Sequence, residues 1–209
     1  MPELEQLLRL AAQASVQEAR LAAARARLLA RADSEGLLDV RYGSIESPLG
    51  TLLAAATSGG LVRLAFPEEP TDSVLERLSS RISPRIVESP AALDPWRREL
   101  EQYFSGQRRS FQAPLDWSLI GPFAQRVLQA TCAIPYGRVL TYSEVAAKAG
   151  SPRGSRAAGN ALGSNPIPVV IPCHRVLRSG GTLGGYGGGL PRKRQLLELE
   201  GALPPTLEG

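Results

Sequence analysis

Residues 142–176 read YSEVAAKAGSPRGSRAAGNALGSNPIPVVIPCHRV, and their pattern gives the clearest indication of how this chain folds. Two segments of helical composition, 142–150 and 153–163, are separated by a short turn, and each ends at a glycine. Ser143 is the expected cap of the first segment. Two short helices joined by a tight turn have the form of a helix-turn-helix, whose second helix commonly enters a DNA groove. A helical hairpin that binds nothing also fits this pattern.

The sequence PCHRV places Cys173 beside His174, the only histidine of the chain. The thiolate is the reactive form of cysteine, and His174, Arg175 and Arg178 supply a base and positive charge that would lower its pKa. Neighbouring residues of an extended strand point to opposite sides, so we expect His174 to reach the thiol through a bridging water. Glu200 is the candidate carboxylate for orienting the imidazole. A structural cysteine beside an exposed histidine is the alternative.

The chain divides into three expected regions. Residues 1–36 predict one helical extension, because they are rich in Ala, Leu, Arg, Gln and Glu. Its role stays open between packing on the next region, self-association and a partner site. Residues 37–119 predict an antiparallel meander of three strands (LLDVRYGSI, TLLAAAT, LVRLAF) followed by helices at 71–82 and 92–105. Residues 120–209 begin with the helix PFAQRVLQATCAI and close with another after Pro191.

Charge is distributed unevenly along the chain. Residues 1–116 carry 14 basic and 16 acidic side chains, a net charge of −2, whereas residues 117–209 carry 10 and 4, a net charge of +6. A basic half is typical of a protein that docks on a phosphate backbone. A solvated basic face is the alternative.

Cysteine and histidine content argues against a metal site. Cys132, Cys173 and His174 are the only residues of these two types, too few for a four-ligand zinc site, so we expect no metal. We expect free thiols, with a single disulfide as the alternative. No uninterrupted apolar run approaches the ~18 residues of a membrane span. We therefore expect a cytoplasmic protein without a membrane partner.

Four segments in order, PYGRVLTYSEVAAKAG, RAAGNALGSNPIPVVIPCHRV, LGGYGGGL and LLELEG, resemble the O6-alkylguanine-DNA alkyltransferases, or methylated-DNA–protein-cysteine methyltransferases. The resemblance implies an α/β (α+β) fold, with an RNase H-like domain at 37–119 and a winged helix-turn-helix-like DNA-binding and catalytic domain at 120–209. It implies direct-reversal DNA repair, in which the alkyl group of O6-alkylguanine, and also O4-alkylthymine, passes irreversibly to Cys173 after base flipping. It implies double-stranded DNA as partner, no cofactor and no obligate protein partner; self-association on DNA stays open.

The same resemblance implies roles for single residues. Cys173 would be the alkyl acceptor, His174 its base through a water, and Glu200 the carboxylate that polarises His174. Asn165 would brace the cysteine loop, and Tyr142 would promote flipping and protonate the departing guanine. The residues that would contact DNA, with an arginine finger and small neighbours on the second helix, are Arg156, Ala157, Gly159 and Tyr142. The pocket for the flipped base would be formed by Pro168, Val176, Tyr186 and Gly187. Some members carry a side chain where this chain has Gly187.

Three other functions compete with this one. A non-catalytic lesion-recognition protein would replace the cysteine, which is intact here. A Cys-His hydrolase would turn over repeatedly and would need a base that approaches the thiol directly. A transcriptional regulator would need an effector domain, for which the sequence gives no sign.

Overall fold

A computed structural model gives the structure of the chain and describes residues 2–204. Contacts divide the chain into two compact units, Met1–Asp39 and Val40–Gly209. The first contains α1 (Pro2–Ser34), an unbroken helix of 33 residues, which confirms the helix expected there. Side chains from Ser15 to Leu28 are all exposed. Arg31 in the last turn bonds Glu35 at 2.8 Å, and its charge also suits the helix C-terminus.

The second unit begins with a four-stranded sheet in the order β3-β2-β1-β4. The strands are β1 (Val40–Ile45), β2 (Leu52–Thr57), β3 (Gly60–Ala65) and β4 (Ile86–Glu88). The three expected strands do form an antiparallel meander. β4, which runs parallel to β1, was not expected, because three residues are too short to show a periodic pattern.

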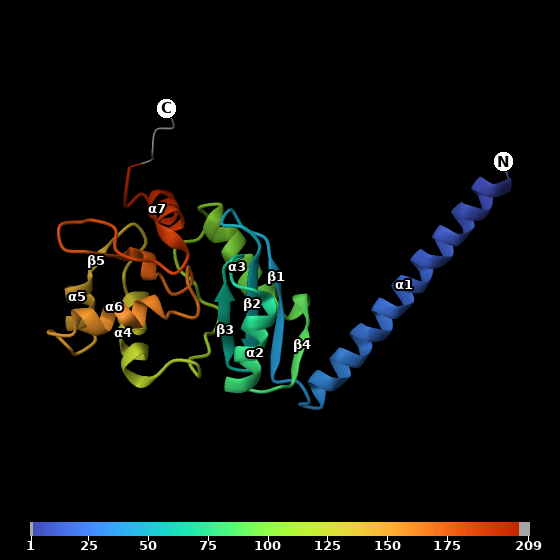
Figure 1. Cartoon of the computed structure of the whole chain (residues 1–209), viewed down its shortest axis with the longest axis horizontal. Coiled ribbons are helices and arrows are strands. Elements are labelled where there is room, and N and C mark those ends of the chain that lie inside the picture. The colour runs from blue at the N-terminus through green and yellow to red at the C-terminus, as the bar shows by residue number, and fades with distance from the viewer. Residues whose placement is uncertain (1, 205–209) are drawn as a thin grey trace. The chain divides into compact units, whose positions relative to one another are not determined.

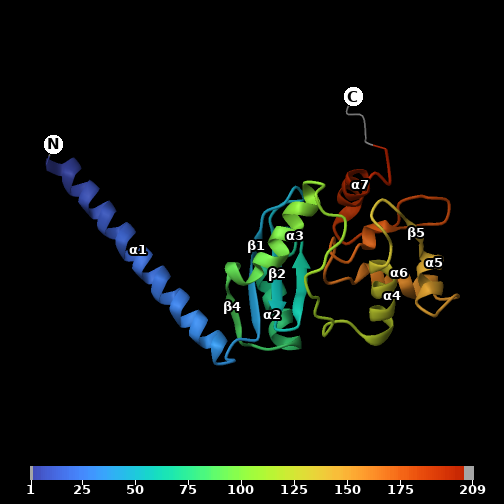
Figure 2. The same ribbon diagram turned by 180° about the vertical axis from the view of Figure 1, so that it is seen from behind.

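Helices cover both faces of this sheet (Figures 1 and 2). α2 (Thr71–Arg81) packs with Ala55 of β2 on one face, whereas α3 (Asp94–Phe104) packs with Ala54 and Ala56 on the other. Successive residues of a strand point to opposite faces, so the apolar run of β2 supplies both layers. The helices expected at 71–82 and 92–105 are thereby confirmed.

The outer edge of β3 is covered by two distant segments. The N–H of Leu61 donates to the carbonyl of Pro114 at 2.9 Å, and the N–H of Leu64 donates to the carbonyl of Pro166 at 2.9 Å. Gly60 adopts φ 131°, and a Cβ at this position would overlap the carbonyl of Pro114. A glycine is therefore required where the chain after α3 meets the sheet.

The remaining elements are helical, with one two-stranded pair. α5 (Tyr142–Lys148) and α6 (Ser155–Gly163) are the two short helices that the sequence predicted. The cap of α5 is Thr141 rather than Ser143, because Thr141 and Glu144 form a capping box. One buried apolar cluster extends from the sheet and α3 into α4, α6 and α7, which confirms the α/β (α+β) class. The other elements are α4 (Pro122–Cys132), β5 (Leu140–Thr141), β6 (Val176–Leu177) parallel to it, and α7 (Gly189–Leu199).

Candidate functional site

Cys173 begins a single 3₁₀ turn, Cys173–Arg175, and is only 6% exposed. The expectation that it lies in an extended strand is therefore wrong. Asn165 holds this turn: its Nδ2 donates to Sγ of Cys173 at 3.1 Å and to the carbonyl of Ile171 at 3.0 Å. Its Oδ1 accepts the N–H of Ile167 at 3.0 Å. The side chain thus joins the end of α6 to the sulfur of Cys173.

The turn that carries Asn165 is fixed to the sheet. The carbonyl of Pro166 accepts the N–H of Leu64 at 2.9 Å and Nη1 of Arg63 at 3.2 Å. Further along, Val169 adopts φ 72°, which is strained for a β-branched residue. Val169 is fully buried. Packing around it and the hydrogen bonds of Asn165 therefore keep the loop before Cys173 in this strained backbone conformation.

His174 and Glu200 lie together in the protein interior. Nε2 of His174 is 2.9 Å from Oε1 of Glu200, and neither side chain is exposed. If Nε2 carries the proton, Nδ1 is left as an acceptor, and Nδ1 is buried without a hydrogen-bond partner among the described residues. Burial lowers the pKa of His174, although Glu200 acts in the opposite direction. A neutral imidazole with a free acceptor nitrogen is suited to take up a proton.

Glu200 is bound by more donors than the sequence indicated. Nε and Nη2 of Arg175 donate to it at 2.9 and 2.8 Å, and the hydroxyl of Tyr103 donates at 2.6 Å. Burial alone would raise the pKa of Glu200, but the hydrogen bonds from His174, Arg175 and Tyr103 hold it at about 2. The carboxylate therefore stays ionised beside the imidazole.

The thiol lacks the cationic neighbours that its sequence context suggested. Arg175 is directed at Glu200 and at the carbonyl of Ile134, and burial raises the pKa of Cys173 to about 11. The hydrogen bond from Asn165 and the charge of Lys193 act against that shift. A thiol with so high a pKa needs a proton acceptor at the moment of reaction.

Lys193 is the functional candidate that sequence reasoning missed. It is completely buried, and its Nζ donates to the carbonyls of Val176 at 2.6 Å and Gly184 at 3.3 Å. Burial lowers its pKa to about 8, while the nearby thiolate of Cys173 would raise it. The available signal was its position on α7, because Leu196 and Leu197 follow at helical spacing and place Lys193 on the buried face.

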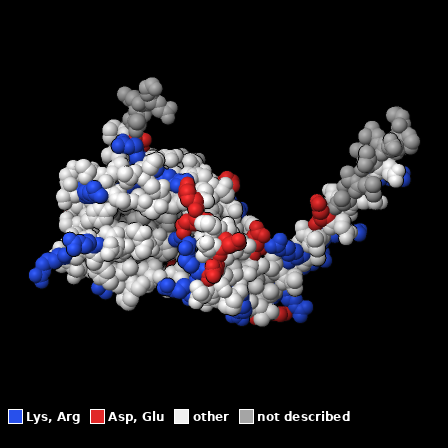
Figure 3. All heavy atoms as spheres, in the orientation of Figure 1, with Lys and Arg blue, Asp and Glu red and all other residues white. Residues whose placement is uncertain are grey.

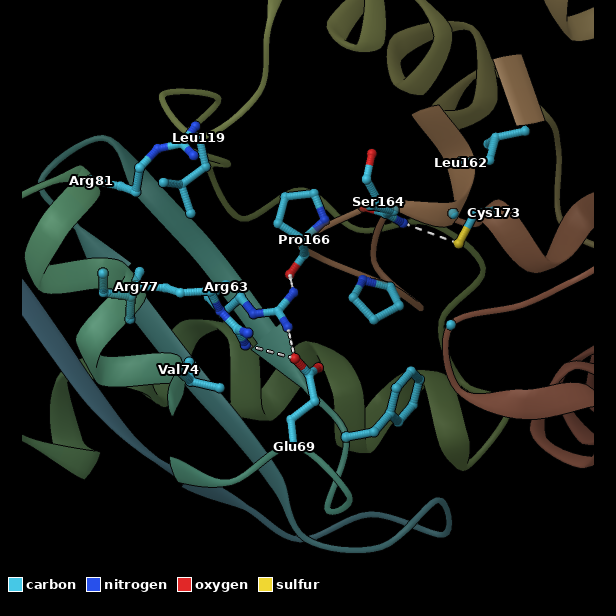
Figure 4. A pocket seen from close by; sticks show the side chains of 16 residues that line it. Arg63, Glu69, Val74, Arg77, Arg81, Leu119, Leu162, Ser164, Pro166 and Cys173 are labelled. Carbon is cyan, nitrogen blue, oxygen red and sulfur yellow. Dashed lines mark hydrogen bonds and ion pairs between the residues drawn. The ribbon is translucent and has the colours of Figure 1, made fainter. Parts of the chain in front are cut away.

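Two hollows share part of their lining, and Cys173 lines one of them. A cavity of about 480 Å³ is lined by Pro168, Cys173 and Gly187, among others (Figure 4). A second hollow of about 600 Å³ brings together five residues that the sequence assigned to DNA or to the base: Tyr142, Arg156, Gly159, Tyr186 and Gly187. Gly163 and Gly187 line both, and a Cβ at either would meet no atom within 4 Å. The hollows are therefore adjacent.

Two of the residues assigned to DNA or the pocket line neither hollow. Ala157 is exposed on α6, and Val176 is fully buried in β6, where its carbonyl accepts Lys193. The hydroxyl of Tyr142 is 3.4 Å from the carbonyl of Gly185, and burial raises the pKa of Tyr142, so its phenol stays protonated at neutral pH. The hydroxyl of Tyr186 is buried without a partner among the described residues.

Figure 3 shows how charge is distributed on one face. The part formed by α4, α5 and α6 carries basic side chains and no acidic one on the face displayed, whereas both signs mix over the sheet. Within residues 2–204, no group of three or more His, Cys, Asp and Glu side chains is placed to hold a metal ion. None of the described helices has the length and apolar character to span a membrane.

Two family models match consecutive parts of the chain. The model described as "6-O-methylguanine DNA methyltransferase, ribonuclease-like domain" matches residues 40–117. The model described as "6-O-methylguanine DNA methyltransferase, DNA binding domain" matches residues 122–202. Together they cover the sheet with its helices and the segment that contains the thiol.

Whole proteins are also similar. The methylated-DNA–protein-cysteine methyltransferase of Mycobacterium tuberculosis is 40% identical over 168 residues, which are 80% of this chain and 96% of that protein. The crystal structure of M. tuberculosis O6-methylguanine methyltransferase superimposes with a TM-score of 0.67 at 38% identity, covering 79% of this chain and 95% of that one. A structure of the M. tuberculosis protein in complex with DNA gives a TM-score of 0.66 at 38% identity over 78% and 93%.

Proposed function

The chain belongs to the 6-O-methylguanine DNA methyltransferase family, and we propose that Cys173 is the residue that accepts the alkyl group. The enzyme is of the methylated-DNA–protein-cysteine methyltransferase type and repairs DNA by direct reversal of the damage. The observation that supports Cys173 is its place in a cavity, beside a buried His174–Glu200 pair whose Nδ1 is still unpartnered.

The proposed reaction is a nucleophilic substitution. The thiol proton passes through a bridging water to Nδ1 of His174, and the ionised Glu200 stabilises the imidazolium that results. Sγ of Cys173 then attacks the alkyl carbon, so the S–C bond forms as the C–O6 bond breaks. The electron pair of that bond leaves with guanine, and the hydroxyl of Tyr142 supplies the proton that neutralises the base.

Asn165 and Lys193 are the residues that position the thiol of Cys173. Asn165 fixes the direction of Sγ through its 3.1 Å hydrogen bond. Lys193 places a buried positive charge near the sulfur, and this charge favours the thiolate over the thiol. The thiolate of Cys173 is thereby stabilised at the position from which it attacks. Before the reaction the thiol remains largely protonated, because burial raises its pKa.

The second hollow is the proposed entrance for DNA. A base inside a duplex is out of reach of a buried sulfur, so the alkylated nucleotide has to leave the stack. Arg156 on α6 is the proposed finger that fills its place, and Ala157 and Gly159 let α6 approach the minor groove closely. Tyr186, Pro168 and Gly187 form the proposed pocket for the extruded base, and Val176, which lines neither hollow, supports it from β6. The similar M. tuberculosis protein has been crystallised with DNA, which supports DNA as the partner.

O4-alkylthymine is a second substrate, because it also presents an alkyl group on an exocyclic oxygen. The proposed domains are an RNase H-like region at 37–119 and a DNA-binding, catalytic region at 120–209, preceded by a separate extension at 1–36. The reaction uses no cofactor, and the protein acts in the cytoplasm.

Intact-mass measurement tests the proposal. After incubation with a duplex that contains one O6-methylguanine, the protein should gain the mass of one CH₂, located on the peptide that carries Cys173. The gain should occur once per molecule and should be absent in Cys173→Ala. Loss of the lesion with an unmodified sulfur, or repeated turnover by one protein molecule, would contradict the mechanism and favour a hydrolase.

A further inference from the structure

The helix α1 lies outside both family models, the first of which begins at residue 40. It is a single unbroken helix (Figure 1). Every side chain from Ser15 to Leu28 is exposed, and Leu21 and Leu28 are 71% and 67% exposed. Helices of proteins owe most of their stability to the packing of an apolar face against another element. The exposed leucines of α1 are therefore a candidate contact surface.

Leucine and alanine recur along α1 at heptad spacing. Positions 7, 14, 21 and 28 hold Leu, Ala, Leu and Leu, each seven residues after the last. Residues at this spacing lie on one side of a helix, and an apolar repeat of seven residues over three or more heptads is typical of a helix that pairs with another helix. The repeat spans almost the whole length of α1.

Two opposite charges belong to the same face. Positions 11, 18, 25 and 32 complete it, because each follows a member of the repeat by four residues. The outer two hold alanine, and the inner two hold Glu18 and Arg25, which are exposed. The midpoint between these two charges falls between Leu21 and Ala22, near the centre of the apolar repeat.

An antiparallel pair of helices matches these charges. A two-fold axis at that midpoint places Glu18 of each helix near Arg25 of the other, so two ion pairs form. A parallel pair in register would instead bring like charges together. The two halves of α1 agree: residues 2–18 carry one basic and three acidic side chains, a net charge of −2, whereas residues 19–34 carry four and one, a net charge of +3. Antiparallel pairing brings the unlike halves together.

We propose that α1 is a dimerisation helix, which pairs in antiparallel orientation with α1 of a second copy of this chain. Leu21 and Leu28 become buried in the seam between the helices. Glu18 of each copy forms an ion pair with Arg25 of the other copy, and these pairs fix the register. The helices then overlap over roughly residues 9–34. This pairing goes beyond the proposed function and does not depend on it.

The opposite side of α1 carries a row of arginines. Arg20, Arg27 and Arg31 follow at i, i+7 and i+11, so they share one face, and all three are exposed. Such a row is also typical of a contact with DNA. DNA bound there would leave Leu21 and Leu28 in water, whereas pairing of two copies buries these leucines and keeps the arginines solvated. A second copy is therefore the occupant that suits both faces.

Sedimentation equilibrium of the full chain without DNA, between about 1 and 100 µM, tests the pairing. The unmodified protein should reach twice the mass of one chain. Leu21→Asp should raise the dissociation constant of the dimer at least about tenfold, because it places a charge in the apolar seam twice. Val16→Asp is the matched control. Val16 is also exposed, at 53%, but it precedes Arg20 by four residues and lies on the arginine side, so this variant should remain dimeric.

Charge reversals at low ionic strength test the orientation. In the antiparallel pair, Glu18→Arg or Arg25→Glu alone replaces both ion pairs by like charges and should raise the dissociation constant about tenfold. The double variant Glu18→Arg/Arg25→Glu restores opposite charges and should return within about threefold of the unmodified value. Arg20→Glu makes the same change of charge as Arg25→Glu on the opposite side of the helix, and it should leave the dissociation constant within the same range.

Three results would overturn the pairing. The first is the mass of one chain at every concentration; if Arg20→Glu then weakens DNA binding, α1 contacts DNA instead. The second is a dimer that Leu21→Asp leaves intact, which would place the interface on another surface. The third is an equal dissociation constant for all the charge reversals, as expected for a parallel pair. Methyl transfer to Cys173 should proceed in every variant, so each of these outcomes is distinct from failure of the proposed function.

Discussion

The hydroxyl of Tyr103 donates a 2.6 Å hydrogen bond to Oε1 of Glu200, and both side chains are buried. Tyr103 belongs to α3 on the sheet, whereas Glu200 caps α7 at the other end of the chain. The same Oε1 is 2.9 Å from Nε2 of His174. The sheet-containing part of the molecule thus reaches the carboxylate that orients the proposed base.

Tyr103→Phe should weaken both folding and transfer. The substitution keeps the ring and removes a hydrogen bond to a charged group, worth about 2 kcal/mol of unfolding free energy. Because the Tyr103 hydroxyl helps to lower the pKa of Glu200, its loss should raise that pKa and slow methyl transfer. Urea unfolding and single-turnover rates measure the two effects. Tyr42→Phe is the matched control, since its hydroxyl has no hydrogen bond to a described residue; equal losses in both variants would contradict the assigned role.

The free energy of unfolding should fall steeply at acid pH because Glu200 becomes protonated. Its pKa is depressed from an ordinary 4.5 to about 2, so its contribution is complete above pH 4.5 and disappears as pH falls toward 2. That contribution is at most about 3 kcal/mol. Glu200→Gln should be less stable at pH 7, and its stability should vary less between pH 5 and 2. Unfolding monitored by circular dichroism across this pH range measures the effect. If the unfolding free energy of Glu200→Gln falls with pH as steeply as that of the unmodified protein, the prediction is wrong.

Lys193→Met should make the thiol of Cys173 harder to ionise. Methionine fills a similar volume but removes a buried charge that lowers the pKa of the thiol. An upward shift of one unit in the thiol pKa would slow thiolate-dependent reactions about tenfold at neutral pH. The rate of Cys173 alkylation by iodoacetamide as a function of pH measures that pKa. Arg194→Met, which removes an exposed cation from the same helix, should leave the profile unchanged.

Arg156→Ala should affect repair of duplex DNA selectively. Arg156 is exposed at the start of α6 and lines the hollow with Tyr142 and Gly159. If it fills the gap left by an extruded nucleotide, transfer from a duplex should slow on the order of tenfold, while reaction with free O6-alkylguanine base should be unaffected. Equal losses on both substrates would remove the finger role. Arg98→Ala serves as the charge-matched control.

Gly60→Ala should destabilise the protein by about 2 kcal/mol or more. The residue has φ 131°, and an added Cβ would overlap the backbone of Pro114. Gly121→Ala is the control, because its φ is −69° and a Cβ there meets no atom within 4 Å. Chemical denaturation should show a change within about 0.5 kcal/mol for the control. Similar denaturation midpoints for Gly60→Ala and Gly121→Ala would show that stability does not require a glycine at position 60.

Local sequence patterns accounted for much of the fold. Alternating apolar residues and turn signals predicted β1, β2 and β3, and helical spacing predicted α2, α3, α5 and α6. The 3₁₀ turn at Cys173 was not predicted, because it is created by distant bonds: Asn165 holds the sulfur, and Leu64 holds the carbonyl of Pro166. Periodicity carries no information about such contacts.

The electrostatics of the site were the part least accessible from sequence. Proximity along the chain suggested that Arg175 lowers the pKa of the thiol, yet its guanidinium is directed at Glu200. The cation that does act on the thiol, Lys193, is 20 positions away and is brought close only by the packing of α7. Which charges face one another depends on tertiary structure, and burial then determines how strongly they interact.

The hydrogen bonds along the outer edge of β3 also bear on the solubility of the protein. A free strand edge offers unpaired N–H and carbonyl groups on which the strand of another molecule can add. Here Pro114 and Pro166 occupy that edge, and a proline has no N–H with which to extend a ladder. Detaching the Pro166 turn would therefore displace the sulfur of Cys173 and also expose the edge of β3 at Leu64. That edge would then be free to pair with a strand of another molecule, and intermolecular β-sheet of this kind leads to aggregation.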